Sequence, residues 1–253
     1  MVRGVGEDRD MQIAFVGKGG AGKSVISATT ARLIGRQGHP VLALDMDTMP
    51  GLALSLGMLA GPEGLPEDLA EQREGEGWVM RTDVSAAELV RRHALPGPDG
   101  VRLLTLGKLP GHVRPGSTTA FRRALGFAEE GWSVVGDLAA GTRQAFFGWA
   151  GFAKIVVLVV EPTAKSILSA RRLALLRPSL PDTAFVVVAS QAREPADGPR
   201  VAEALGLPLA GVVPYDASVR DAERAGHAPI DAVPDAPAML AVRELLASLG
   251  RIA

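Results

Sequence analysis

The chain contains no cysteine, and aromatic residues make up only 4% of its 253 residues. The absence of cysteine excludes disulfides, thiolate metal ligands and cysteine nucleophiles. Net charge is also nearly absent, at −1, so no overall basic field attracts the protein to nucleic acid or anionic lipid. No apolar run reaches the ~20 residues that span a bilayer, and the N-terminal residues do not resemble a signal peptide. We therefore expect a cytoplasmic protein.

Short apolar runs, by contrast, are plentiful, and hydrophobic residues account for 47% of the chain. Continuous β-branched runs such as Ile155–Val160 are typical of strands that are buried on both faces. Strands are predicted at 12–16, 40–45, 101–107, 132–137, 154–160, 183–189 and 209–213. Helical patterns lie between them at 23–37, 117–130, 163–177, 197–205, 216–225 and 235–249. This alternation predicts a three-layer, doubly wound α/β fold, with a mostly parallel sheet of about seven strands and helices on both faces.

The length suits a single domain over residues 11–253, preceded by a flexible extension at 1–10. Residues 58–100 are the least regular part and are expected to form a variable surface excursion. Glycine and charged residues dominate this excursion, which favours a loop over a separate lobe.

A glycine-rich turn carries the strongest functional signal, because Gly17-Lys18-Gly19-Gly20-Ala21-Gly22-Lys23-Ser24 matches the pattern G-x-x-x-x-G-K-S. It follows an apolar run and opens a helical pattern at Val25, so loop N–H groups and the helix dipole converge on a phosphate. Lys23 can reach the terminal phosphates of a nucleotide, and the Ser24 hydroxyl can ligate Mg²⁺. The predicted nucleotide-binding residues of this turn are Gly17, Gly19, Gly20, Ala21, Gly22, Lys23, Ser24 and Val25.

The additional lysine at position 18 gives K-G-G-x-G-K-S, which resembles the deviant Walker A box of the ParA/MinD ATPases. That group includes the CooC-type nickel-insertion ATPases. The resemblance implies a P-loop ATPase, a homodimer bridged by ATP, and a Lys18 that reaches the partner subunit's nucleotide. The alternative is a solvated lysine beside a polyphosphate of its own subunit.

Three carboxylates are expected near the phosphates. Asp45 and Asp47 end one predicted strand and share a face, and Asp137 ends another. The first pair resembles the family's D-x-D-P segment, with Thr48 in place of the proline. The resemblance implies that Asp47 positions or deprotonates the attacking water and that Asp45 holds Mg²⁺ through a water.

Asp137 is predicted to bind Mg²⁺ as well, and the Gly141 N–H to approach the γ-phosphate. The segment Asp137-Leu138-Ala139-Ala140-Gly141 looks like the D-x-x-A-G switch of the CooC-type subgroup. An acidic surface turn at Asp45 and Asp47, or a capping role for Asp137, are the simpler alternatives.

The base is expected against Pro214, Tyr215 and Asp216, which resemble the family's I-P-Y-D turn. Gln191 stands near the position where the family often has an asparagine, and its amide can both donate to and accept from a base. ATP is the nucleotide implied by the resemblance, although the residues alone would allow GTP.

The CooC-type subgroup is the most similar one, by Leu104–Lys108 and by Glu161-Pro162-Thr163. Its C-x-C pair is missing, because residues 111–118 contain no cysteine, and His112 alone is a poor metal site. A nickel-handling role therefore loses its main chemical support.

We expect an ATPase switch, a CooC-like accessory or maturation protein that couples ATP-bridged dimerisation to a client or activating protein. The alternative is a ParA/MinD-like partitioning or positioning ATPase that acts on DNA, membrane or a protein cargo. A scaffold that binds nucleotide without hydrolysing it is a third possibility, disfavoured by Asp47. Residues 239–249 are amphipathic but poor in lysine and aromatics, which favours a core-packed helix over a membrane anchor.

Overall fold

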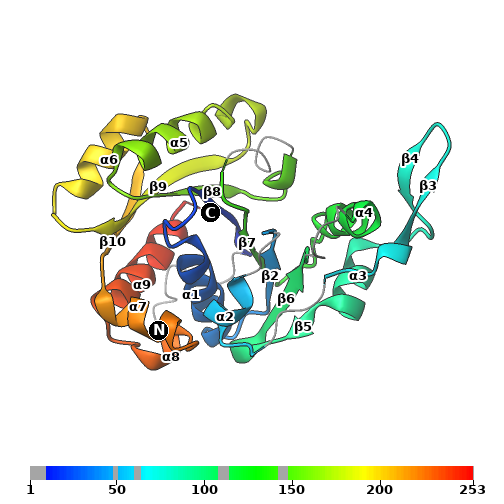
Figure 1. The fold of residues 1–253 in the computed structure, drawn as a ribbon, viewed down its shortest axis with the longest axis horizontal. Coiled ribbons are helices and arrows are strands. Elements are labelled where there is room, and N and C mark those ends of the chain that lie inside the picture. Colours follow the sequence, from blue (N-terminus) through cyan, green and yellow to red (C-terminus); the bar gives the residue numbers. More distant parts are fainter. Residues whose placement is uncertain (1–9, 48–50, 60–63, 108–113, 142–147, 253) are drawn as a thin grey trace, which may run out of the picture.

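A computed structural model describes residues 10–47, 51–59, 64–107, 114–141 and 148–252. Its main sheet has eight strands in the order β10-β9-β8-β1-β7-β2-β6-β5 (Figure 1). The strands are β1 Gln12–Gly17, β2 Val41–Asp45, β5 Leu95–Pro96, β6 Val101–Thr105, β7 Ser133–Asp137, β8 Ile155–Val160, β9 Ala184–Ala192 and β10 Leu209–Pro214. The seven predicted strands are all present and parallel, and the short β5 adds an antiparallel edge.

The central strand β1 shows why the sheet needs helices on both faces. Its side chains alternate between two hydrophobic clusters: Ile13 and Phe15 enter one, whereas Ala14 and Val16 enter the other. All four are at most 1% exposed. A strand that is apolar on both sides must be covered on both sides, which confirms the predicted three-layer fold.

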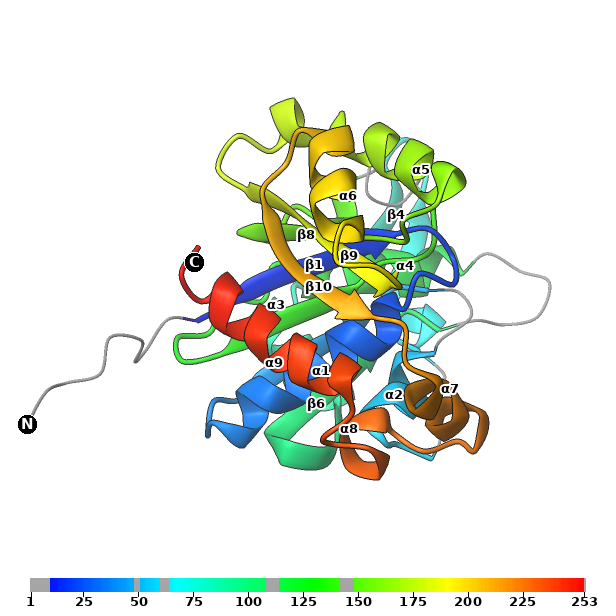
Figure 2. The same cartoon turned by 90° about the vertical axis from the view of Figure 1, so that its left-hand side faces the viewer.

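Two helical layers provide this cover, as Figure 2 shows. One layer contains α1 Lys23–Arg36, α2 Leu52–Leu56, α7 Ala217–Arg224, α8 Pro229–Ala232 and α9 Pro237–Leu249. The other contains α3 Ala86–His93, α4 Pro115–Ala124, α5 Ala164–Ala174 and α6 Asp197–Leu205. The predicted C-terminal helix is core-packed, because Val242, Leu245 and Leu249 are fully buried. Among the described residues, no helix is both long and apolar enough to cross a membrane.

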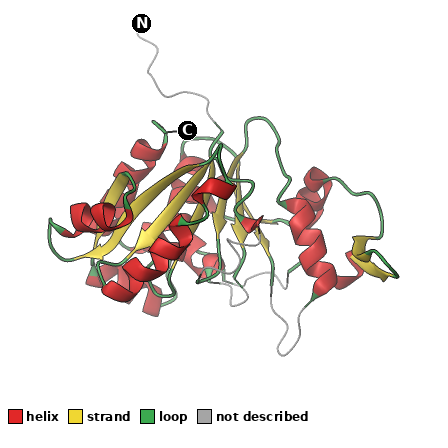
Figure 3. Ribbon diagram, turned by 90° about the horizontal axis from the view of Figure 1, so that it is seen from above, coloured by secondary structure: helices red, strands yellow, loops and turns green. Residues whose placement is uncertain are grey.

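The excursion differs from the loop that the sequence favoured. Strands β3 Ala70–Arg73 and β4 Gly77–Met80 pair as an antiparallel hairpin that projects away from the main sheet (Figures 1 and 3). Glu67 fixes this lobe to α4, since its carboxylate accepts hydrogen bonds from the N–H groups of Gly116 (2.9 Å) and Ser117 (3.0 Å). These contacts join positions that are 49 and 50 residues apart in the sequence, so local composition could not reveal them. Residues 1–9 lie outside the described part, and Asp10 accepts a hydrogen bond from the Gly131 N–H at 2.9 Å.

A buried arginine holds the end of α1 against three other segments. The Arg32 side chain is 4% exposed, and its guanidinium donates to Asp99 (2.7 Å), to the Leu56 carbonyl (3.3 Å) and to Asp231. Arg36, which is 35% exposed, contacts the same two aspartates. Arg32 therefore connects α1 with α2, with the turn before β6 and with α8.

Because of this burial, Arg32→Leu is expected to cost about 3 kcal/mol of unfolding free energy, as the loss of one partner from a buried ion pair does. Arg36→Leu removes a half-buried guanidinium from the same carboxylates and is expected to cost less than about 1 kcal/mol. Urea unfolding of the two variants gives the comparison. Equal losses in the two variants would contradict the role assigned to Arg32.

Candidate nucleotide-binding site

The predicted site residues meet at the carboxyl ends of the central strands, the edge at which doubly wound sheets bind ligands. Gly17 ends β1, Asp45 ends β2 and Asp137 ends β7. The strand register places Asp137 directly beside Asp45 on one side and beside Phe15 on the other. Parallel pairing thus brings together residues from three distant parts of the sequence.

The glycine turn between β1 and α1 has the backbone that only glycine adopts readily. Gly20 and Gly22 have φ angles of 82° and 84°, in the left-handed region. A Cβ on Gly17 would lie 2.3 Å from the Val159 carbonyl oxygen, so the loop begins in close contact with β8. Helix α1 starts at Lys23, which leaves the N–H groups of its first turn directed toward the loop.

Ser24 and Asp137 form the polar floor of the site. The Ser24 hydroxyl donates to Oδ2 of Asp137 at 2.6 Å, and Oδ1 of the same carboxylate is buried without a hydrogen-bond partner in the described structure. Burial raises the pKa of Asp137 to about 6, against the positive charge of Lys23 and the hydrogen bond from Ser24. An unpartnered carboxylate oxygen beside a hydroxyl is the type of hard oxygen ligand set that suits Mg²⁺.

Asp45 lies beside Asp137 in the neighbouring strand and is completely buried. Its two oxygens accept hydrogen bonds from the backbone N–H groups of Asp47 and Leu52, each at 3.1 Å. Burial and the neighbouring Asp137 raise the pKa of Asp45 to about 7, although the two hydrogen bonds oppose that rise. Asp45 therefore anchors both sides of the segment that follows β2, a role that the sequence did not predict.

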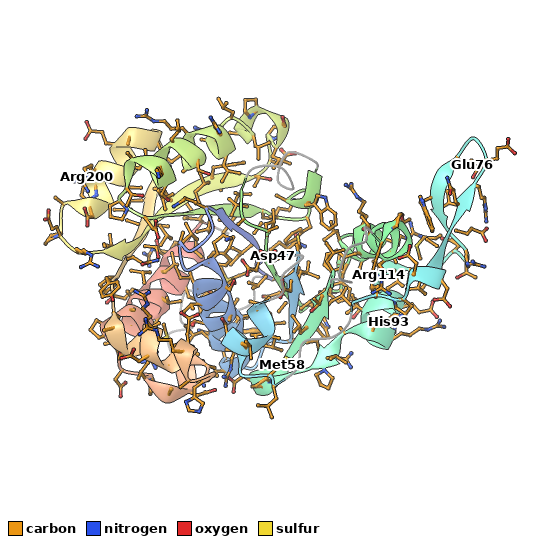
Figure 4. All side chains as sticks on the ribbon, viewed as in Figure 1. Asp47, Met58, Glu76, His93, Arg114 and Arg200 are labelled. Carbon is orange, nitrogen blue, oxygen red and sulfur yellow. The ribbon has the colours of Figure 1, made fainter. Side chains whose placement is uncertain are left out.

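Asp47 is half-buried near the middle of the molecule (Figure 4). Its charge contributes to raising the pKa of both Asp45 and Asp137, so the three carboxylates lie within electrostatic reach of one another. Thr48 and the two residues after it fall outside the described part of the chain.

A cavity of about 270 Å³ lies next to the glycine turn, at the position expected for the base. Gln191, Pro214, Tyr215 and Asp216 all line it, together with loop and α1 residues Gly20, Gly22, Val25 and Ile26. Its far wall was missed by sequence reasoning, since Val219 of α7 and Met239 and Val242 of α9 complete it. No local motif marks these apolar residues, because the fold alone brings the C-terminal helices to the turn.

Two of the predicted base contacts already have other partners. The Asp216 carboxylate accepts from the Ser218 N–H at 3.0 Å and from the Ala238 N–H at 3.3 Å, so it caps α7 and ties α9 to it. The Ser218 hydroxyl also donates to this carboxylate, at 2.6 Å, and lowers the pKa of Asp216 most, and the backbone hydrogen bonds lower it further. The Gln191 amide nitrogen donates to the Gly20 carbonyl at 2.6 Å, which leaves its oxygen for a base.

Tyr215, the single tyrosine of the chain, has a neighbour that the sequence did not indicate. The guanidinium carbon of Arg193 lies 4.5 Å from the centre of the Tyr215 ring. This stacking is a cation–π contact and restricts the plane of the ring at the edge of the cavity.

Gly141 lies against the start of the glycine turn. Its N–H donates to the Gly17 carbonyl at 3.2 Å, and its φ of 98° requires glycine. The predicted contact between this N–H and a γ-phosphate would therefore replace an existing hydrogen bond.

Lys18 and Lys23 have opposite environments although they share one turn. Lys23 is 7% exposed and interacts electrostatically with the buried Asp137, whereas the Lys18 side chain is 41% exposed. The Lys18 ammonium lies 3.9 Å from Oε2 of Glu161, which follows β8. The two lysines of the turn thus have different partners, Glu161 for Lys18 and Asp137 for Lys23.

The described residues contain no group of three or more His, Cys, Asp or Glu side chains placed to hold a metal. The similar subgroup has its C-x-C pair in the segment that corresponds to residues 111–118. Of that segment, residues 111–113, including His112, lie outside the described part of the chain.

A strand, a left-handed glycine turn with a buried lysine, and a serine paired with a buried aspartate define a P-loop nucleotide-binding protein. The chain belongs to the CobQ/CobB/MinD/ParA nucleotide-binding domain family, whose model matches residues 13–230.

The relatives identified by sequence cover most of the chain. It is 29% identical over 232 residues to an uncharacterized ATP-binding protein of Methanocaldococcus jannaschii, covering 85% of this chain and 90% of that protein. It is 28% identical to the carbon monoxide dehydrogenase accessory protein CooC of Rhodospirillum rubrum, covering 88% and 91%. It is 31% identical to the antiactivator FleN of Pseudomonas aeruginosa, covering 90% and 81%.

Solved structures show the same fold. The cell division ATPase MinD of Pyrococcus furiosus superposes with a TM-score of 0.71 at 20% identity, over 97% of this chain and 100% of that one. MinD of Pyrococcus horikoshii, solved with Mg-ADP, superposes with a TM-score of 0.72 at 18% identity, over 94% and 95%.

Proposed function

We propose that this protein is a Mg²⁺-dependent ATPase that dimerises around ATP and couples the dimer to a partner protein. The observation that carries the proposal is the contrast between the two lysines of the turn. The buried Lys23 serves the nucleotide of its own subunit, so the exposed Lys18 is free to serve a nucleotide held by a second copy. A lysine that enters another active site acts like an arginine finger, by balancing charge that develops on the transferred phosphoryl group.

Within one subunit, the remaining groups divide the work. The turn and α1 bind the phosphates, and the cavity between α1, α7 and α9 takes the adenine. Ser24 and Asp137 would hold Mg²⁺ directly or through water, and Asp45, which pairs with Asp137 in the strand register, would hold the ion through a water. The ion supplies charge neutralisation for the phosphates when bound. Asp47 orients the attacking water or takes its proton.

The partner is proposed to be a client protein in the manner of an accessory or maturation ATPase. Support comes from the similarity to the CooC accessory protein, which extends over nearly the whole of both chains. Because the chain has no cysteine and so no thiolate ligands, we propose that a partner protein, and not this chain, binds any metal that is delivered to the client. Similarity to the antiactivator FleN and to MinD supports the alternative, a regulatory or positioning ATPase.

Sedimentation of the wild-type chain with no nucleotide, with ADP and with an ATP analogue that resists hydrolysis tests the proposal. We expect a monomer in the first two conditions and a dimer in the third, together with Mg²⁺-dependent phosphate release from ATP. A monomer in all three conditions would refute the dimeric switch. ATP-dependent, salt-sensitive binding to DNA, or ATP-dependent sedimentation with anionic vesicles, would favour the alternative.

A further inference from the structure

Glu161 lies at the end of β8 and is held from two sides. Its Oε1 accepts a hydrogen bond from the Gln191 amide nitrogen at 3.2 Å, and its Oε2 faces the Lys18 ammonium at 3.9 Å. The same Gln191 nitrogen donates to the Gly20 carbonyl at 2.6 Å. Glu161 and Gln191, which lie outside the glycine turn, thus contact the turn at Lys18 and at Gly20 respectively.

This arrangement has a rigid base. The Glu161 N–H donates to the Ser166 hydroxyl at 3.1 Å, which fixes the turn between β8 and α5. Gln191 has a φ of 55°, a left-handed conformation that is uncommon for a residue with a side chain. Such backbone strain persists where surrounding contacts enforce it and is often found at functional sites.

We propose that Glu161 is a positioning residue that keeps Lys18 on its own subunit until the nucleotide of a second subunit takes the lysine. This inference rests on the proposed function, because it assigns the state of Lys18 before dimerisation. A carboxylate carries a single negative charge, whereas the terminal phosphates of ATP carry several. Lys18 therefore leaves Glu161 when a partner's nucleotide approaches.

The size of the effect follows from the exposure of the pair. The side chains of Lys18 and Glu161 are 41% and 20% exposed, and partly exposed ion pairs shift equilibria by about 1.4- to 5-fold. A symmetric dimer breaks one such pair in each subunit, so the two factors multiply. Removing the carboxylate charge should therefore tighten the dimer by about 2- to 25-fold.

Glu161→Gln tests this, because the amide oxygen can still accept from Gln191 while the charge is lost. With the ATP analogue, we expect the dimer dissociation constant to fall by the amount given above, and ATP affinity at concentrations where the chain is monomeric to stay unchanged. Glu161 and Glu194 both line a second cavity beside the site. Glu194→Gln is therefore the matched control, and we expect this variant to dimerise as the wild type does. An unchanged or weaker dimer in Glu161→Gln would overturn the inference.

The effect must also depend on Lys18. In the double variant Lys18→Ala/Glu161→Gln, we expect the same lack of dimerisation as in Lys18→Ala alone. Recovery of the dimer in the double variant would show that Glu161 acts through another group. If the wild-type chain dimerises and Lys18→Ala does not, an inert Glu161→Gln refutes this inference alone, whereas a wild type that never dimerises refutes the proposed function.

Discussion

Lys18→Ala is expected to abolish the ATP-dependent dimer while leaving ATP binding by the monomer nearly unchanged. The Lys18 side chain is 41% exposed and contacts Glu161, so its loss leaves Lys23, Ser24 and the backbone N–H groups of the turn in place to bind the phosphates. In a dimer, its loss would leave phosphate charge unbalanced in both sites. Sedimentation with the ATP analogue measures the first effect, and titration with a fluorescent ATP analogue measures the second.

Two further variants control this experiment. Lys165→Ala removes an exposed lysine at the start of α5 and should behave as wild type. Lys23→Ala removes the buried lysine and should lose nucleotide affinity itself. An unaltered sedimentation profile for Lys18→Ala would disprove its action in the second subunit.

Asp47→Ala is expected to lower ATP turnover by about 100-fold or more, the usual contribution of a general base. Nucleotide binding should remain, because the glycine turn, Lys23 and Ser24 are all intact in this variant. Since hydrolysis would be needed to release the dimer, the variant should accumulate as a dimer in ATP. Phosphate release and sedimentation in ATP itself give the two measurements.

Asp235→Ala, at an exposed position before α9, is the control for a general loss of acidic charge. Normal turnover in Asp47→Ala would exclude it as the water-positioning residue. Slow turnover without accumulation of the dimer would separate hydrolysis from dimer release.

Local patterns predicted the sheet well because buried parallel strands leave continuous apolar runs. Ile155–Val160 is an example, and its six residues are all buried in β8. The glycine turn could also be predicted from the sequence, since a turn that binds phosphate requires particular residues at fixed spacing. The hairpin of the excursion could not be predicted in this way, because contacts between distant parts of the sequence hold it. An example is the hydrogen bond from the Gly116 N–H, at the start of α4, to the Glu67 carboxylate.

The base cavity shows a second limit. The sequence identified Tyr215 from a short motif, but it gave no sign of Arg193 on the ring or of Met239 in the opposite wall. Asp216 lines the cavity as predicted, but the sequence gave no sign that its carboxylate also caps α7. Patterns reveal groups that must be near one another in the chain, whereas these partners are brought together by packing.

The position of β1 has a consequence for how the protein is made. In the sheet, β1 lies between β7 and β8, and its residues pair with Val134–Asp137 and with Ile155–Val159. During synthesis the first strand must wait for more than half of the chain to leave the ribosome before either edge can pair. Its apolar residues stay uncovered over that interval. The nascent protein is therefore expected to depend on chaperones, and chains released before β7 is complete should aggregate instead of forming a stable half-domain.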